Sequence, residues 1–364
     1  KVLKKMLPYF SDRFYNPHSI NTKYNQDIIN DIELARSNIA KLIGADDQDI
    51  VFTSGATEAN NMAIKGLELK IKRGKNHFIT LNTEHKCVLE AMRRVELNGG
   101  QLSILKVNKK GLIDPRMVEK SIKSNTALVS IMFANNETGV IQPIKKIAQI
   151  CKEKKVLFHS DAAQAIGKIE INVKDMGIDL MSISAHKFYG PKGIGALYIR
   201  GFPRIRLSPL IDGGGQEINL RSGTLPVPLC IGFGEAAKIA KKSLQKEAKT
   251  TKELRDYFII SLKKKIDNII INGDLKNRLP ANINFSIPNI KAKEIIQSLK
   301  YTIISSGSAC TSSSVDPSYV LSGMGLKKDV VESSLRVGIG RFSTKTDIDK
   351  AVQDIYQTVK LQRK

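Results

Sequence analysis

Short apolar runs alternate with amphipathic stretches over the first two thirds of the chain. Five of these runs have the length and composition of buried strands: Asp49–Thr53, His77–Leu81, Gln101–Val107, Ala127–Phe133 and Val156–His159. The stretches between them carry apolar residues at helical spacing: Glu58–Lys72, Val88–Asn98 and Ile144–Lys154. Strands that alternate with helices predict an α/β fold whose mostly parallel sheet is covered by helices on both faces.

The pattern changes near residue 243. A long basic helix over Lys238–Lys265 is followed by three strand-like runs and one short helix: strands Ile283–Ile287, Tyr301–Ile304 and Leu335–Ile339, and helix Lys291–Leu299. Thr344 and Asp347 form a capping pattern ahead of a last helix whose apolar stripe begins at Ile348. We therefore expect a large domain over residues 1–242 and a smaller α+β domain over residues 243–364.

The composition is ordinary for a globular protein, but the charge is not. Lys and Arg total 58 and Asp and Glu total 35, which gives a formal net charge of +23. Such a charge raises the hypothesis of nucleic-acid binding. The lysines are spread along the chain, aromatic residues make up 6% and tryptophan is absent, which argues against a nucleic-acid surface. A lysine-rich, solvated surface is the alternative.

The apolar runs argue against a membrane-spanning protein, and the cysteines argue against a protein built on zinc or disulfides. No run approaches the roughly 18 apolar residues that span a bilayer, so we expect no membrane-spanning segment. Cys87, Cys151, Cys230 and Cys310 lie far apart, which argues against a zinc site and against a disulfide framework. We expect no metal site, and a reducing compartment fits the cysteines best.

Three segments at predicted strand ends carry candidate chemistry. Residues 53–58, Thr-Ser-Gly-Ala-Thr-Glu, join a strand to a helix, where small residues and free N–H groups suit an anion; a capped turn without a ligand is the alternative. Asp161 follows a buried strand and needs a partner, which is more often structural. Lys187, beside Ser184 and His186, suits Schiff-base chemistry, although one lysine in a basic chain is usually solvated.

Together the three segments match the requirements of pyridoxal 5'-phosphate. Its phosphate needs N–H and hydroxyl donors, its pyridine nitrogen needs a carboxylate, and its aldehyde needs a lysine. Cys310 adds a signal, because it lies in the small polar run 305–314, which predicts an exposed mobile loop. A cysteine there indicates a reactive thiol, with an incidental exposed cysteine as the alternative. Cys87, Cys151 and Cys230 lie in helical or apolar contexts and are expected to be structural.

The chain resembles the pyridoxal-phosphate-dependent cysteine desulfurases of the iron–sulfur cluster assembly type, in the class V aminotransferase superfamily. The resemblance rests on six motifs: Thr-Ser-Gly-Ala-Thr-Glu (53–58), Thr-Glu-His-Lys (83–86), Asn-Asn-Glu-Thr-Gly (135–139), His-Lys-Phe-Tyr-Gly-Pro-Lys-Gly (186–193), Arg-Ser-Gly-Thr (221–224) and Ser-Ser-Gly-Ser-Ala-Cys-Thr-Ser (305–312). It implies a type I pyridoxal-phosphate transferase fold. The large domain would bind the cofactor, and the small domain would carry the mobile cysteine loop.

The resemblance also implies a role for each matching residue. Lys187 would bind the cofactor aldehyde and move the substrate α-proton, while His85 would stack on the ring and assist proton transfer. Asp161 would pair with the pyridine nitrogen, and Gln164 would bond the ring hydroxyl. The other implied contacts are to the phosphate by Ala56, Thr57, Ser184 and His186, to the phosphate of the neighbouring subunit by Thr224, and to the amino-acid substrate by Asn136 and Arg336.

The same resemblance implies the reaction and the partners. L-cysteine would become L-alanine, a persulfide would form on Cys310, and the sulfur would pass to an iron–sulfur scaffold protein or to tRNA thiolation. A homodimer is implied, in the cytoplasm of a bacterium or in the mitochondrial or mitochondrion-derived matrix of a eukaryote. The competing functions are a selenocysteine lyase or another class V aminotransferase-like enzyme, and a basic RNA-binding or scaffold protein without enzymatic activity.

The sequence departs from the family pattern at several positions. Ala185 stands where the family has Gly before His-Lys, and Tyr15 stands where Gly usually precedes Asn-Pro. The family's opening Asp-x-x-Ala-Thr-Thr strand and its scaffold-docking tail are not in this sequence. We expect the chain to be truncated at both ends.

Overall fold

The computed structural model describes residues 1–19, 23–70, 74–201, 205–306 and 317–363, which divide into two compact units. The first unit consists of Lys1–Leu105, Pro115–Phe133 and Pro143–Leu244. The second consists of Lys106–Asp114, Ala134–Gln142 and Gln245–Lys364. The boundary expected at 242/243 lies two residues before that of the structure, and it leaves out the two short segments that join the second unit.

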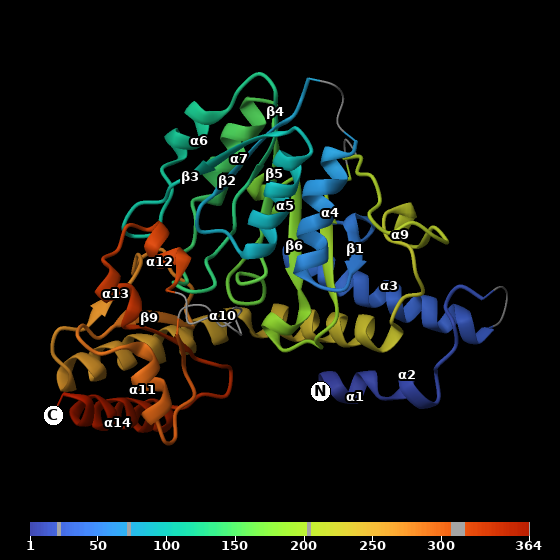
Figure 1. Cartoon of the computed structure of the whole chain (residues 1–364). Helices are drawn as coiled ribbons and strands as arrows, with labels where there is room; N and C mark the ends of the chain where they lie inside the picture. The colour runs from blue at the N-terminus through green and yellow to red at the C-terminus, as the bar shows by residue number, and fades with distance from the viewer. Residues whose placement is uncertain (20–22, 71–73, 202–204, 307–316, 364) are drawn as a thin grey trace. The chain divides into compact units, whose positions relative to one another are not determined.

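A seven-stranded sheet forms the centre of the first unit (Figure 1). Its spatial order is β1 (Ile50–Thr53), β7 (Gly195–Ile199), β6 (Leu180–Ser184), β5 (Leu157–Asp161), β4 (Thr126–Ser130), β2 (His77–Leu81) and β3 (Gln101–Leu105). All pairs from β6 to β3 are parallel, whereas β7 is antiparallel to both of its neighbours. β1 therefore runs in the same direction as the parallel strands, and the predicted mostly parallel α/β sheet is confirmed.

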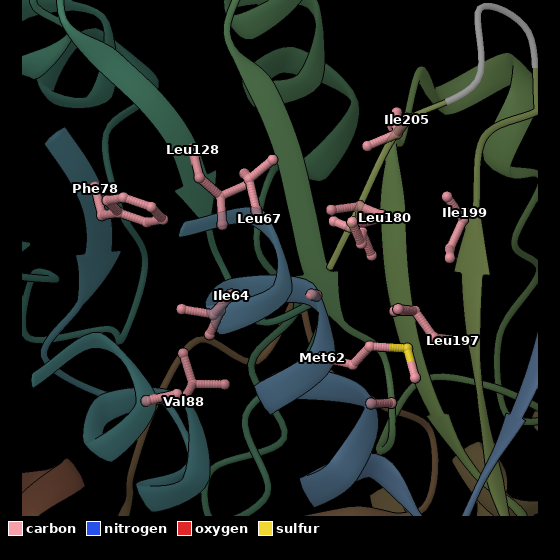
Figure 2. Close-up of a cluster of buried hydrophobic side chains, with 14 of the residues drawn as sticks. Met62, Ile64, Leu67, Phe78, Val88, Leu128, Leu180, Leu197, Ile199 and Ile205 are labelled. Carbon is pink, nitrogen blue, oxygen red and sulfur yellow. The ribbon is translucent and has the colours of Figure 1, made fainter. Parts of the chain in front are cut away.

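Helices cover both faces of this sheet. On one face, α4 (Ala56–Glu68) and α5 (Lys86–Leu97) pack on the strands through a buried apolar cluster, and Figure 2 shows Met62 and Leu67 of α4 within it. Val51 of β1 belongs to this cluster. The next residue, Phe52, points to the other face, where its ring lies 6.3 Å from that of Phe233 in α10 (Val227–Lys265). Successive side chains of β1 thus point to opposite faces of the sheet, and each face packs against different helices.

The remaining helices of the first unit are short, apart from α3. They are α1 (Val2–Met6), α2 (Pro8–Ser11), α3 (Lys23–Ile43), α6 (Pro115–Ser121), α7 (Ile144–Glu153), α8 (Val173–Met176) and α9 (Gln216–Asn219). No helix among the described residues has the length and apolar content needed to cross a membrane.

The second unit is an α+β unit with its own core. Its antiparallel sheet has the order β10 (Ser305–Ser306), β11 (Ser334–Gly338), β9 (Asn282–Ser286) and β8 (Ile270–Ile271). Its helices are α11 (Ala292–Ser298), α12 (Tyr319–Gly323), α13 (Lys328–Glu332), α14 (Lys345–Gln362) and the C-terminal part of α10. Phe258 of α10, Phe285 of β9 and Val352 of α14 meet in the core. The predicted capping box of Thr344 and Asp347 is present at the start of α14.

The strand expected over Tyr301–Ile304 is not formed, so that prediction is wrong. Asp354 of α14 accepts hydrogen bonds from the backbone N–H groups of Lys300, Tyr301 and Thr302 at 3.3, 3.0 and 2.9 Å. These donors are therefore not available to a strand ladder. Tyr301 is 85% exposed and Ile303 is fully exposed. A strand begins only at Ser305.

Substitution of Asp354 tests whether its carboxylate holds the backbone of residues 300–302 in place. Asp354→Ala is expected to lower the free energy of unfolding by about 1–3 kcal/mol, because three backbone donors lose a charged acceptor. Urea unfolding followed by circular dichroism measures the change. Gln357→Ala, on the exposed side of the same helix, is the control and is expected to change the value by less than about 0.5 kcal/mol. Equal effects of the two substitutions would contradict the anchoring role.

Candidate active site

Most of the residues expected to bind a cofactor lie where parallel strands of the large sheet end, at one edge of the sheet. β1, β2, β5 and β6 run in the same direction and end at Thr53, Leu81, Asp161 and Ser184. The carboxyl ends of such strands are where α/β sheets bind ligands. Eight of the expected site residues lie at these strand ends or in the segments that follow them: Ala56, Thr57, His85, Asp161, Gln164, Ser184, His186 and Lys187.

The turn between β1 and α4 has the open space that an anion needs. α4 begins at Ala56 with Gly55 as its N-cap residue, and this glycine provides no side-chain cap. A Cβ added to Gly55 would meet no atom within 4 Å. Open space therefore lies beside the start of a 13-residue helix, where N–H groups and the helix dipole favour a phosphate.

Two contacts fix the shape of this turn. A Cβ on Gly195, at the start of β7, would lie 2.7 Å from the Cα of Gly55, so only glycine permits this close approach. Glu58 accepts from the backbone N–H of Ser54 at 2.7 Å and from Nε of Arg221 at 2.9 Å. Burial alone would raise the pKa of Glu58, but these donors lower it, so the carboxylate stays ionised.

Asp161 ends the central strand β5 and is only 6% exposed. Its two carboxylate oxygens accept hydrogen bonds from Nδ2 of Asn60 at 2.8 Å and from the backbone N–H of Ala163 at 2.9 Å. Both donors are neutral, and a buried carboxylate gains more from a cationic partner. Gln164 lies three residues on, where its Oε1 accepts from Lys168 at 3.0 Å. Neither carboxylate oxygen of Asp161 is bonded to a cation by these contacts.

His85 lies at the start of α5 and caps it. Its Nδ1 accepts from the backbone N–H of Cys87 at 3.3 Å and lies 3.0 Å from Sγ of Cys87. Sγ in turn accepts from Nδ2 of Asn60 at 3.2 Å. Burial, and then the charge of Asp161, raise the pKa of Cys87 to about 12. Cys87, which the sequence analysis expects to be structural, thus contacts His85 and Asn60 through its thiol.

Lys187 lies in a turn of 3₁₀ helix, η2 (Ala185–Phe188), directly after β6. The hydroxyl of Ser184 lies 2.9 Å from Nδ1 of His186. Burial, Lys187 and Lys192 lower the pKa of His186, which keeps its ring neutral at pH 7. Ala185, which replaces the family's glycine, is accommodated because residue 190 is glycine: a Cβ on Gly190 would lie 2.9 Å from the methyl group of Ala185.

Thr224 is exposed. It ends a segment that is bound to the turn between β1 and α4. Arg221, three residues before it, binds Glu58 at the start of α4. Further upstream, Glu217 forms a buried ion pair with Arg36 at 2.8 Å and accepts from the backbone N–H of Phe52 in β1 at 2.6 Å. The segment is thus tied to β1 and to α4.

The expected substrate-binding residues belong to the second unit and are close together. Nη1 of Arg336 donates to the backbone carbonyl of Asn136 at 3.1 Å, and its Nε donates to the Ser305 hydroxyl at 3.2 Å. Oδ1 of Asn136 is buried and makes no hydrogen bond to the described residues. A guanidinium beside an unsatisfied amide suits an amino acid with its carboxylate and ammonium groups. Cys310 lies outside the described residues.

Three residues of the site were missed by the sequence analysis. Asn60 and Glu84 are fully buried, and Cys87 is half-buried beside His85. Burial raises the pKa of Glu84 well above its usual range, although the backbone N–H of Met132 donates to it at 2.8 Å. Asn60 has a signal in the sequence, because it is a polar residue on the apolar face of α4, next to Ala59. Glu84 and Cys87 flank His85, but their burial depends on distant parts of the chain.

The first unit therefore combines a helix start with open space beside it, a buried carboxylate, a lysine at a strand end and an imidazole. This set can hold a phosphate ester and a protonated heterocycle, and can move a proton. In the described part of the chain, no three or more His, Cys, Asp or Glu residues form a group that could hold a metal ion.

Comparison with known families and sequences agrees with this arrangement. The aminotransferase class-V family model matches residues 1–351. The cysteine desulfurase IscS of Rickettsia massiliae is 49% identical over 352 residues, which cover 97% of this chain and 86% of the relative. IscS of Rickettsia typhi is 49% identical over 364 residues, which cover all of this chain and 89% of the relative.

Solved structures give the same result. A NifS-like protein superposes with a TM-score of 0.92 at 33% identity, covering 99% of this chain and 95% of that protein. SspA in complex with cysteine has a TM-score of 0.83 at 38% identity, covering 94% of this chain and 96% of that protein. By family model, sequence and fold, the chain belongs to the cysteine desulfurases of the aminotransferase class-V family, a pyridoxal-phosphate-dependent class of enzymes.

Proposed function

We propose that this protein converts L-cysteine to L-alanine and forms a persulfide on Cys310. The observation that carries the proposal is that the 53–58 turn, Asp161 and Lys187 lie at strand ends on the same edge of the sheet, in a chain that belongs to the cysteine desulfurases. The Cβ–Sγ bond of the substrate breaks, a bond forms between that sulfur and the Cys310 thiolate, and Cβ takes up a proton. The sulfur passes from substrate to enzyme, and no further oxidant is required.

Pyridoxal 5'-phosphate fits the residues of the first unit. When bound, this cofactor withdraws electrons from the substrate carbon next to its amino group. Ala56, Thr57, Ser184 and His186 would hold its phosphate, Asp161 its pyridine nitrogen and Gln164 its ring hydroxyl. Lys187 would hold the aldehyde carbon, and His85 would lie on the ring face.

The substrate and proton steps fall to a second set of residues. Arg336 would bind the carboxylate of L-cysteine as a bidentate partner, and Asn136 would fix its orientation. Lys187 would carry the proton from the substrate α-carbon, and His85 would assist in its transfer. The relative solved with cysteine supports L-cysteine as the substrate.

Partners and compartment form the last part of the proposal. A homodimer would place Thr224 against the cofactor phosphate of the neighbouring subunit. The sulfur acceptor would be an iron–sulfur scaffold protein, as the IscS relatives suggest, with tRNA thiolation as an alternative route. The rickettsial relatives favour a bacterial cytoplasm over a mitochondrial or mitochondrion-derived matrix.

Lys187→Ala tests the cofactor site. The purified wild-type protein is expected to absorb at about 400 nm, as pyridoxal enzymes with a bound lysine do, and the variant is expected to lose this band and alanine production. Lys192→Ala, five residues along the same loop, is the control and is expected to keep both. A colourless wild-type protein that instead binds RNA with a steep salt dependence would favour the non-enzymatic alternative.

Cys310→Ala tests the sulfur step separately. The variant is expected to bind L-cysteine and change its visible spectrum, but to release alanine at least about 100-fold more slowly, because no thiolate attacks the substrate sulfur. Mass spectrometry is expected to find the added sulfur on Cys310 of the wild-type protein. Cys151→Ala, at a buried thiol, is the control. Undiminished L-cysteine turnover by Cys310→Ala would contradict the mechanism, and a strong preference for selenocysteine would favour the lyase.

A further inference from the structure

The thiol of Cys87 lies at the meeting point of three parts of the proposed cofactor site. Its Sγ lies 3.0 Å from Nδ1 of His85 and 3.2 Å from Nδ2 of Asn60, which belongs to the first turns of α4. Asn60 in turn donates to Asp161 at 2.8 Å. One thiol therefore links the helix start that would hold the phosphate, the carboxylate that would face the ring nitrogen, and the imidazole that would cover the ring.

The direction of these hydrogen bonds follows from the donors present. The backbone N–H of Cys87 can only donate, and it points to Nδ1 of His85 at 3.3 Å. Nδ1 must therefore be an acceptor, and a neutral His85 carries its proton on Nε2. The thiol stays protonated at pH 7, because burial and the charge of Asp161 raise its pKa to about 12. Its S–H group is then a second donor to Nδ1.

The carboxamide of Asn60 lies at the other end of this series of hydrogen bonds. Its Nδ2 group has two hydrogens, and the structure uses one for Asp161 and one for the sulfur of Cys87. The side chain of Asn60 is fully buried between these partners. The hydrogen bonds therefore run in one direction, from Asn60 through Cys87 to His85, and leave Nε2–H of His85 as a donor. Such oriented chains strengthen one another.

We propose that Cys87 and Asn60 are positioning residues that hold His85 in its Nε2–H form and couple its orientation to Asp161. This inference rests on the proposed function, because it concerns the imidazole that would cover the cofactor ring. Cys87 itself takes no part in sulfur transfer: a protonated thiol is a poor nucleophile. The site thus uses one cysteine as a hydrogen-bond donor, while Cys310 is the acceptor of sulfur.

The experiment compares removal of the thiol with its replacement by a hydroxyl. Cys87→Ala deletes the donor to His85, whereas Cys87→Ser keeps a group that accepts from Asn60 and donates to Nδ1. Cys151→Ala deletes a thiol that is fully buried on α7 and whose pKa burial likewise raises to about 12. It is the matched control for the loss of packing alone.

The direct measurement is the tautomer of His85 in resting enzyme without L-cysteine. The chain has five histidines, so nitrogen NMR of protein labelled at histidine gives a simple spectrum, and His85→Gln assigns the signals. We expect an acceptor-type Nδ1 and a protonated Nε2 in the wild type, in Cys87→Ser and in Cys151→Ala. In Cys87→Ala we expect the two signals to move toward each other, because only the longer backbone hydrogen bond remains.

The kinetic measurement separates positioning from substrate binding. We expect Cys87→Ala to lower kcat for alanine formation about tenfold, the cost of about one hydrogen bond, with KM for L-cysteine changed less than about twofold. Cys87→Ser is expected to recover at least about a third of the wild-type kcat. Asn60→Ala is expected to lower kcat and also to release the cofactor faster during dialysis, because Asp161 loses an orienting donor.

The outcomes distinguish this inference from the proposed function. Wild-type signals and wild-type kcat in Cys87→Ala would overturn the positioning role, and so would equal losses in Cys87→Ala, Cys87→Ser and Cys151→Ala, which would reflect packing. Failure of the proposed function would show itself elsewhere, as a wild-type protein that forms no alanine. The NMR result on His85 would still report whether the hydrogen-bond chain exists.

Discussion

A carboxylate at the end of the central strand is the constraint on which the site depends. Asp161 is buried, and an isolated buried charge costs several kcal/mol, so the surrounding structure has to supply donors. The protein supplies two neutral ones, from Asn60 and from the backbone of Ala163. These donors orient the carboxylate without neutralising it. The negative charge that remains is what a protonated pyridine nitrogen would use, and the same charge helps to keep Cys87 protonated.

Close backbone approach is the second condition for the site. Gly195 lets β7 lie against the turn after β1, and Gly190 leaves room for the methyl group of Ala185 ahead of Lys187. These glycines act by having no side chain, and neither takes part in the chemistry. The Arg221–Glu58 ion pair ties the end of one loop to the start of α4. Several distant segments are in this way brought to one edge of the sheet, where none of them alone would form a site.

The sequence predicts those parts of the molecule that depend on local pattern. The strand over His77–Leu81 has the predicted bounds, and the capping box of α14 is found where Thr344 and Asp347 place it, because both signals lie within a few residues. The strand expected at Tyr301–Ile304 is missing, and the backbone N–H groups of its first two residues bond to Asp354, more than fifty residues later. The family motifs identify Asp161 and Lys187, but the links through Asn60 and Cys87 depend on contacts that span strands and helices.

The two kinds of cysteine show how environment divides chemical roles within one chain. Cys87 is surrounded by the carboxylate of Asp161, a carboxamide and an imidazole, a setting that favours the protonated thiol. In the sequence, Cys310 stands in a run of small, mostly polar residues, and it lies outside the described residues. Under the proposed function, one thiol would serve as a fixed hydrogen-bond donor and the other as the nucleophile that accepts sulfur.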